Sequence, residues 1–213
     1  MINLYLDIET IPSQQPWVRE YVASMVTHPG QMKKPENIQK WVEEEKPSAV
    51  EEAMDKCSFD GAMNQIICIG YAVDDEPAQV LIGDELTILK DLFSVAIKCR
   101  HQAKYIGHNI VGFDLRVIKQ RSIVLGYKPP AAIPFDAKPW DNIRVFDTMT
   151  QWDGQNKVRL DKLARAFGIK GKTTDGSQVY QMWKDGKHQE IADYCKEDVE
   201  LTRKVYKQMS YGN

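Results

Sequence analysis

The chain has 213 residues, a mass of 24.4 kDa and a formal net charge of −2, with 43% hydrophobic and 27% charged residues. This composition is typical of globular proteins and excludes collagen-like and wholly disordered chains. No apolar run approaches the ~20 residues of a membrane-spanning helix, and the first ten residues, MINLYLDIET, lack the basic region of a signal peptide.

The cysteines and the charge distribution bear on location and partners. The cysteines are scattered without CxxC spacing: Cys57, Cys68, Cys99 and Cys195. This favours reduced thiols in a cytoplasmic protein and argues against a zinc site. Residues 1–95 hold 7 Lys and Arg against 17 Asp and Glu, whereas residues 96–213 hold 21 against 13. A basic second half permits contact with nucleic acid, although basic residues that only solvate helices would give the same balance.

The first expected elements are a strand and a long insertion. Residues 2–9 alternate strongly and weakly apolar positions with period two, which predicts a strand. Residues 12–60 contain five of the ten prolines, an acidic stretch and no strand pattern. Because structureless loops of this length are uncommon in compact domains, we expect a partly helical insertion. It is a candidate for gating a site or docking a partner, and a solvated helical flap is the simpler alternative.

Strands and helices follow the insertion. Residues 65–73 (QIICIGYAV) predict a central strand with a hairpin partner at 78–82, and Asp84 can cap the next helix. Further strands are expected at 105–107 and 143–146, and helices at 113–125, 160–167 and 190–208. This order predicts one α/β domain over residues 1–213, with a mixed five-stranded sheet flanked by helices.

Two acids occupy the end of the first strand. Asp7 and Glu9 are two residues apart, so their side chains point to the same face, about 6.7 Å apart along the strand. They lie at its C-terminal end, where α/β sheets commonly bind ligands. A solvated pair of acids at a strand end is the competing interpretation.

A third acid lies on the apolar face of the last helix. That face comprises Ile191, Tyr194, Cys195, Asp198, Thr202 and Val205. Asp198 therefore shares it with Tyr194, one turn earlier. A buried carboxylate requires a cation, a hydrogen-bond network or a metal. Pairing with an Arg or Lys of a neighbouring helix would also satisfy it.

A fourth acid begins the helix after the short strand at 105–107. Asp114 ends the segment GHNIVGFD, and alone it is explained by helix capping and the helix dipole. Taken together, Asp7, Glu9, Asp114 and Asp198 offer oxygen ligands of the kind that a pair of Mg²⁺ or Mn²⁺ ions requires. Two such ions about 3.5–4 Å apart promote phosphodiester cleavage. The sequence therefore indicates a two-metal site.

Three short motifs carry a resemblance to a known family. DIET (7–10), NIVGFD (109–114) and YCKED (194–198) resemble the exonuclease motifs of the DEDDy branch of DnaQ-like 3′–5′ exonucleases. Their form is similar to the proofreading domain of family-B DNA polymerases, and most similar to stand-alone predicted exonucleases of that kind. The motifs occur in order across nearly the whole chain, and only the insertion is poorly matched. The resemblance implies a ribonuclease H-like fold.

The resemblance also implies roles by position. Asp7, Glu9 and Asp198 would hold the catalytic cation, with Asp7 bridging to a second cation, and Asp114 would act mainly through the waters of that second cation. Tyr194 would orient the attacking water as a hydrogen-bond partner rather than as a base.

Residues beside these acids would bind substrate or support the fold. Thr10 and Ile11 would lie against the terminal nucleotide, and Asn109 and Phe113 would hold the 3′-terminal sugar and base. Three neighbours that could be mistaken for site residues are expected to be structural: His108, Asp147 and Glu197.

The expected function is metal-dependent 3′–5′ exonuclease activity on single-stranded or mismatched DNA ends, releasing nucleoside 5′-monophosphates. A 3′–5′ exoribonuclease and a catalytically silent binding module are the alternatives. A polymerase or replication partner would act in trans. We expect a strand-binding surface of basic residues on two helices: Arg116, Lys119, Arg121, Arg159, Lys162 and Arg165.

Overall fold

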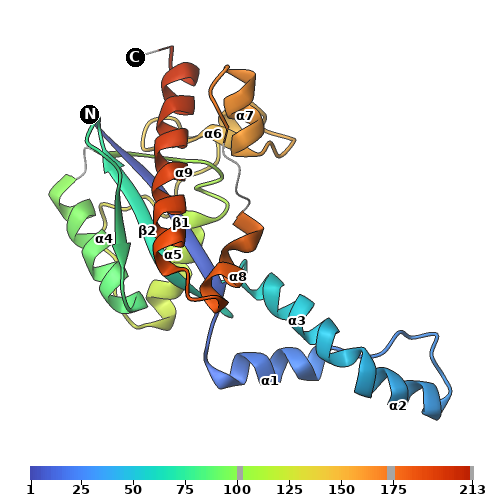
Figure 1. Cartoon of the computed structure of the whole chain (residues 1–213). Helices are drawn as coiled ribbons and strands as arrows, with labels where there is room; N and C mark the ends of the chain where they lie inside the picture. The colour runs from blue at the N-terminus through green and yellow to red at the C-terminus, as the bar shows by residue number, and fades with distance from the viewer. Residues whose placement is uncertain (100–102, 172–175, 212–213) are drawn as a thin grey trace.

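The computed structural model describes residues 1–99, 103–171 and 176–211. Within these residues the strands are β1 (Ile2–Pro12), β2 (Asn64–Val73), β3 (Gln79–Ile82), β4 (Ala103–Gly107) and β5 (Val145–Asp147). They form one sheet in the order β3-β2-β1-β4-β5 (Figure 1). The pairs β1–β2 and β2–β3 are antiparallel, whereas β1–β4 and β4–β5 are parallel. The predicted mixed five-stranded sheet is confirmed.

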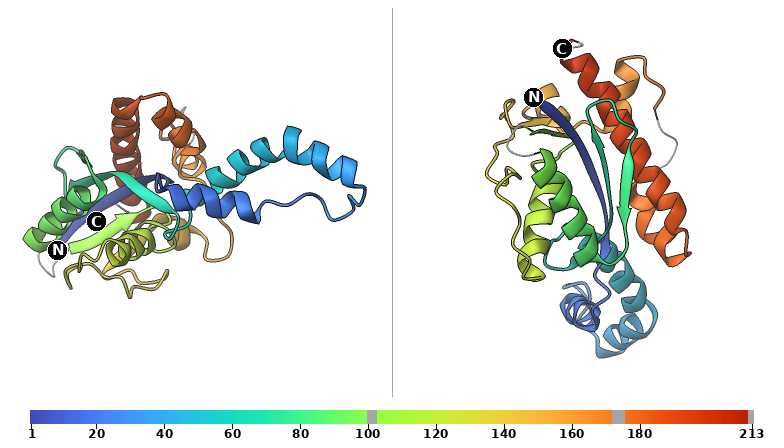
Figure 2. Two further views of the ribbon diagram at one scale, coloured as in Figure 1. Left: turned by 90° about the horizontal axis from the view of Figure 1, so that it is seen from below. Right: turned by 90° about the vertical axis from the view of Figure 1, so that its left-hand side faces the viewer.

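Helices cover both faces of this sheet. α4 (Glu85–Cys99) and α5 (Asp114–Val124) lie on one face, and the long α9 (His188–Met209) crosses the other (Figure 2). The twofold alternation of β1 accounts for this arrangement, because successive side chains of a strand point to opposite faces. Leu4 and Leu6 join the core beneath α4 and α5, whereas Tyr5 contacts Tyr206 of α9 with ring centroids 5.8 Å apart. Odd-numbered residues of β1 therefore face α9.

A glycine sets how closely α9 approaches the sheet. A Cβ added to Gly70 of β2 would lie 2.9 Å from Cys195 Sγ and 2.9 Å from Val199 Cγ2. Real Cβ atoms do not approach other atoms so closely, so a larger residue would push the helix outward. Gly70 also pairs with Asp7 in the β1–β2 register. The close approach therefore occurs directly beside the first acid of the predicted site.

The insertion forms an arm of three helices. They are α1 (Pro16–Met25), α2 (Pro35–Glu44) and α3 (Lys46–Cys57), and each carries proline in its first turn. Proline is favoured there because the first helical amides have no intrahelical partner. Val18 and Val22 of α1 pack against α3 in a small core of their own. The arm extends away from the sheet (Figures 1 and 2), and the C-terminal end of α3 returns to it.

Some short elements were not predicted. α6 (Thr148–Trp152) and α8 (Val179–Lys184) have too few turns to show a helical period in the sequence, and a 3-10 turn, η2 (Gly176–Gln178), precedes α8. α7 (Leu160–Ala166) was expected and ends near Gly168, whose φ of +72° is the left-handed conformation that glycine favours after a helix.

One basic residue of the expected strand-binding surface is instead buried. Arg121 of α5 is only 5% exposed and donates to both carboxylate oxygens of Glu85, at 2.8 Å each. Its third contact is the carbonyl oxygen of Gly61, at 3.2 Å. The prediction was wrong for Arg121, because the sequence could not show that α5 turns this side chain towards α4.

Two further findings concern the chain as a whole. Cys57, Cys68, Cys99 and Cys195 are all free and buried. Among the residues that the structure describes, no helix has both the length and the apolar character needed to cross a bilayer.

Candidate nuclease active site

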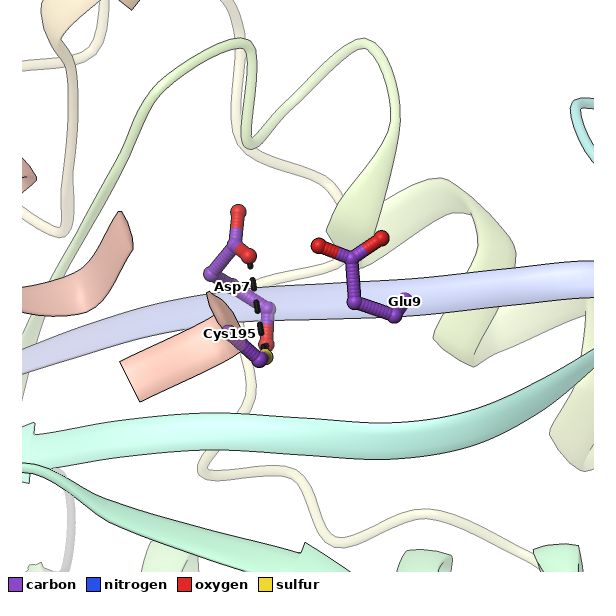
Figure 3. A group of neighbouring side chains, drawn as sticks. All are labelled: Asp7, Glu9 and Cys195. Carbon is purple, nitrogen blue, oxygen red and sulfur yellow. Dashed lines mark hydrogen bonds between the residues drawn. The ribbon is translucent and has the colours of Figure 1, made fainter. Parts of the chain in front are cut away.

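The end of β1 presents two carboxylates towards α9. Asp7 and Glu9 are odd-numbered residues of the strand, so they share the face on which α9 lies, and both are half-buried. Figure 3 shows the two carboxylates extending to the same side of the β1 ribbon. The predicted common orientation of Asp7 and Glu9 is therefore present in the structure.

Cys195 of α9 contacts the backbone of β1 beside this pair of acids. Cys195 Sγ lies 3.6 Å from the carbonyl oxygen of Asp7 and 3.7 Å from its Oδ2, and it accepts a hydrogen bond from the amide of Gly70 at 3.1 Å. Asp7, Glu9 and Cys195 each place a potential ligand atom within 4.8 Å of the other two (Figure 3). Cysteine spacing did not reveal this neighbour, although its position on the apolar face of α9 was a signal.

The acid of the second motif is tied to the same strand. β4 pairs with β1 only as far as Tyr5, so beyond that residue this edge of β1 has no strand beside it. Asp114, the first residue of α5, fills the gap: its Oδ1 accepts a hydrogen bond from the amide of Ile8 at 3.0 Å. The Asp114 carboxylate therefore contacts the backbone between Asp7 and Glu9.

The acids of the second and third motifs are buried and interact electrostatically. Asp114 is 3% exposed and Asp198 is 6% exposed. Burial, together with the negative charges of Asp147 and Asp198, raises the pKa of Asp114 to about 8, although hydrogen bonds from the amides of Asp114 and Ile8 oppose the shift. Asp198 of α9 is thus close enough to Asp114 for their charges to repel.

Tyr194 of α9 interacts electrostatically with both acids of β1. Burial is the main cause of its strongly raised pKa, followed by the negative charges of Asp198, Glu9 and Asp7 and by a hydrogen bond with Asp198. The phenol therefore stays protonated and can act as a hydrogen-bond donor. All five residues expected to form the reaction centre lie at the junction of β1, α5 and α9.

A cavity of about 590 Å³ opens beside these acids. Glu9 and Thr10 of β1 line one side, and Phe113 lines another. The hydroxyl of Thr10 faces the insertion, because it donates to the carbonyl oxygen of Ser58 at 2.6 Å. The volume of the cavity suits a small ligand of the size of one nucleotide.

Ile11 does not line this cavity. Its side chain is 0% exposed and packs with Cys68, Val179 and Ile191 in a hydrophobic cluster. The expectation that Ile11 lies against the terminal nucleotide does not hold in this structure, because Ile11 is a further odd-numbered residue of β1 and is covered by Val179 of α8 and Ile191 of α9.

Asn109 has a backbone role in the loop before α5. Its φ of +61° is the left-handed conformation, which asparagine tolerates better than most residues. Its amide donates to Asp147 Oδ1 at 2.9 Å, and its carbonyl accepts from the amide of Phe113 at 2.8 Å. The loop geometry thus positions Phe113 at the cavity.

The structure also shows the surroundings of the three neighbours that were expected to be structural. Asp147 caps α6 by accepting from the amides of Met149 and Thr150. The ring nitrogens of His108 lie 2.9 Å from Thr148 Oγ1 and 2.8 Å from the carbonyl oxygen of Val158, and Glu197 is exposed on α9.

The donor set of the site fits hard divalent cations. Asp7, Glu9, Asp114 and Asp198 all offer hard carboxylate oxygens, the ligands that Mg²⁺ and Mn²⁺ prefer. Burial, with a contribution from the charge of Asp198, raises the pKa of Asp114, so an ionised carboxylate there costs free energy that a bound cation would offset.

Comparisons with known proteins identify the fold and the family. Residues 62–212 match the model of a family described as predicted 3′–5′ exonucleases related to the exonuclease domain of PolB. The match includes Asp114, Tyr194 and Asp198, whereas Asp7 and Glu9 precede it. The structure is similar to that of the family B DNA polymerase from the hyperthermophilic archaeon Pyrobaculum calidifontis, with a TM-score of 0.60 and 16% sequence identity. This similarity covers 98% of the chain and 24% of the polymerase chain, and it confirms the expected ribonuclease H-like fold. No curated protein matches the sequence.

Proposed function

Because the chain belongs to the family of predicted 3′–5′ exonucleases related to the exonuclease domain of PolB, we propose that it hydrolyses DNA from single-stranded or mismatched 3′ ends. The products would be nucleoside 5′-monophosphates. The chain spans 24% of the polymerase to which its structure is similar. Any proofreading would serve a polymerase that acts as a partner in trans.

The hydrogen bond between Asp114 and the amide of Ile8 is the observation that carries this proposal. It brings the acid of the second motif to the backbone between Asp7 and Glu9. Tyr194, which hydrogen-bonds Asp198, is also within the field of Asp7 and Glu9. Acids from three separate parts of the chain thus meet at one place beside a cavity of nucleotide size.

Asp7, Glu9, Asp114 and Asp198 would hold two divalent cations. When bound, the cations would supply charge stabilisation for both the attacking and the leaving oxygen of a phosphodiester. The carboxylates would fix their positions, and the amide of Ile8 would keep Asp114 oriented.

Other residues of the site would position the reactants. Tyr194 would hold the attacking water by accepting a hydrogen bond from it at the phenol oxygen. Thr10 and Phe113, which line the cavity, would contact the terminal nucleoside. Asn109 would hold the loop that presents Phe113, through its backbone hydrogen bonds.

The proposal is tested with end-labelled oligonucleotides. Single-stranded DNA, duplex DNA and RNA are incubated with Mg²⁺, with Mn²⁺ and with a chelator. We expect release of 5′-mononucleotides from single-stranded DNA only when a cation is present. Faster digestion of RNA would establish the exoribonuclease instead, since the two differ in how the site treats the 2′-hydroxyl. Binding without hydrolysis would establish a silent module.

A further inference from the structure

The insertion contributes an aromatic ring to the cavity beside the acids. Phe59, two residues after the end of α3, lines this cavity together with Phe113. Its side chain is 63% exposed. An exposed phenylalanine loses the stabilisation that burial would give, so its presence in a cavity suggests that something covers it.

Hydrogen bonds hold the backbone on both sides of this ring. The carbonyl oxygen of Ser58 accepts from Thr10 Oγ1 at 2.6 Å and from Asn64 Nδ2 at 3.0 Å. The carbonyl oxygen of Phe59 accepts from Arg116 Nη2 at 3.2 Å. The backbone that carries the ring is therefore held to the first motif through Thr10 and to α5 through Arg116.

The two phenylalanines form one continuous wall. Their ring centroids are 6.1 Å apart, and the ring planes are inclined at 57°. A base inserted between two parallel rings would need about 7–8 Å, twice the contact distance of ~3.5–4.0 Å between carbon atoms. A base therefore cannot enter between Phe59 and Phe113 and must lie against the cavity side of the wall.

The charge of the cavity favours a base over a phosphate. Among the residues that the structure describes, its lining includes Glu52, Asp55 and one lysine, Lys56, besides Glu9, which we propose to hold a cation. The excess of carboxylates disfavours a phosphate group, whereas an uncharged nucleobase can stack on an aromatic ring whatever its identity.

We infer that Phe59 is a positioning residue that stacks on the 3′-terminal nucleobase, so that the insertion forms part of the substrate site. This inference rests on the proposed function for the direction in which the strand enters. Phe59 precedes the range that matches the family model, and it belongs to none of the three sequence motifs.

Kinetics of Phe59→Ala test the inference. Loss of one stacking ring should raise KM for single-stranded DNA about 5- to 100-fold, with little change in kcat. Phe59→Tyr should restore the wild-type KM. A strand that ends in an abasic 3′ residue has no terminal nucleobase, so Phe59→Ala should hydrolyse it with the wild-type KM, whereas Asp198→Ala should not hydrolyse it. Trp140→Ala, which removes an aromatic ring that is 74% exposed and outside the cavity, should behave as wild type.

A binding measurement separates this inference from the hydrolytic function. The fluorescence of 2-aminopurine at the 3′ end of an oligonucleotide should be quenched when the strand binds the Asp198→Asn variant. The quenching should be much weaker with the double variant that carries both Asp198→Asn and Phe59→Ala. A 2-aminopurine placed ten nucleotides from the 3′ end should show the same change in fluorescence on binding either variant. Equal quenching of 3′-terminal 2-aminopurine by the two variants, or an equal rise in KM for the abasic and the ordinary strand, would overturn the role of Phe59. Absence of hydrolysis by the wild type would overturn the proposed function and leave the quenching comparison decisive for Phe59.

Discussion

Asp114 and Ile8 are 106 residues apart in the sequence, yet the carboxylate of one accepts a hydrogen bond from the backbone amide of the other at 3.0 Å. The bond occupies the edge of β1 at the point where its pairing with β4 has ended. Asp114 thereby stabilises the strand end that presents Asp7 and Glu9. One side chain would serve both the local fold and the cation site.

Removal of single acids should abolish hydrolysis without unfolding the protein. Asp7→Ala and Asp198→Ala each take away a carboxylate that we propose to hold a cation. Without metal, Asp198→Ala removes one of the negative charges that contribute to the raised pKa of Asp114, and Asp7→Ala removes a negative charge beside Glu9, so Tm should stay level or rise slightly. Activity assays and thermal melts in chelator measure the two effects. Retention of more than a few per cent of activity by either variant would contradict the two-metal site.

Tyr194→Phe should have a milder effect. The ring would still pack in the cluster formed with Ile11 and Cys195, and only the hydroxyl that hydrogen-bonds Asp198 is lost. We expect kcat to fall by roughly 10²–10³-fold or less, the usual range for a group that assists proton transfer or water positioning. Single-turnover rates give the comparison, and a variant as inactive as Asp198→Ala would require a larger role for the phenol.

Binding of the DNA strand should weaken as salt rises. The basic residues expected to contact phosphates are exposed, except Arg121: Arg116, Lys119, Arg159, Lys162 and Arg165. We expect a shallow salt dependence of KM, equivalent to about two to four phosphates. Lys119→Ala or Lys162→Ala should reduce the slope, as measured by KM at several salt concentrations. A KM that does not vary with salt would remove the basic surface from the mechanism.

Arg121→Met should reduce stability rather than affinity for DNA. Arg121 and Glu85 form a buried pair with side chains 6% and 12% exposed, and loss of the arginine leaves a buried carboxylate unpaired. Such losses cost about 3–5 kcal/mol of unfolding free energy, which urea denaturation measures. The salt dependence of KM, measured well below the lowered Tm, should match that of the wild type.

The strand should be digested from its 3′ end in single-nucleotide steps. A paired end must melt before it enters the cavity, at about 1.4 kcal/mol per base-pair step on average, so mismatched ends should be degraded faster than paired ends. The acidic lining of the cavity should make a 3′-phosphate a poor end. Oligonucleotides blocked at one end measure the polarity, and unimpeded digestion of a 3′-blocked strand would contradict it.

The sequence predicts best what depends on local spacing. The shared face of Asp7 and Glu9 follows from the period of a strand, and the proximity of Tyr194 and Asp198 from the period of a helix. Each of these two predictions required only that the segment be correctly identified as a strand or a helix. The strands and long helices were also found close to their expected bounds, because each shows several turns or alternations.

Contacts between distant segments could not be read from those periods. Arg121 was placed on a surface because nothing local showed Glu85 opposite it. The burial of Ile11 was not foreseen because α8, which covers it through Val179, is too short to show a helical period in the sequence. The cavity wall supplied by Phe59 depends on how the end of α3 returns to β1, which only the folded chain shows.

The close contact of α9 with β1 has a consequence for synthesis of the protein. Cys195 reaches Asp7 across 188 residues of sequence, and Asp198 lies one turn further along the same helix. A ribosome would release β1 early and α9 late, so the acids could not assemble while most of the chain was being made. A partly synthesised or C-terminally truncated chain would then be harmless to nucleic acid, and hydrolytic capacity would arise only as α9 docks on the sheet.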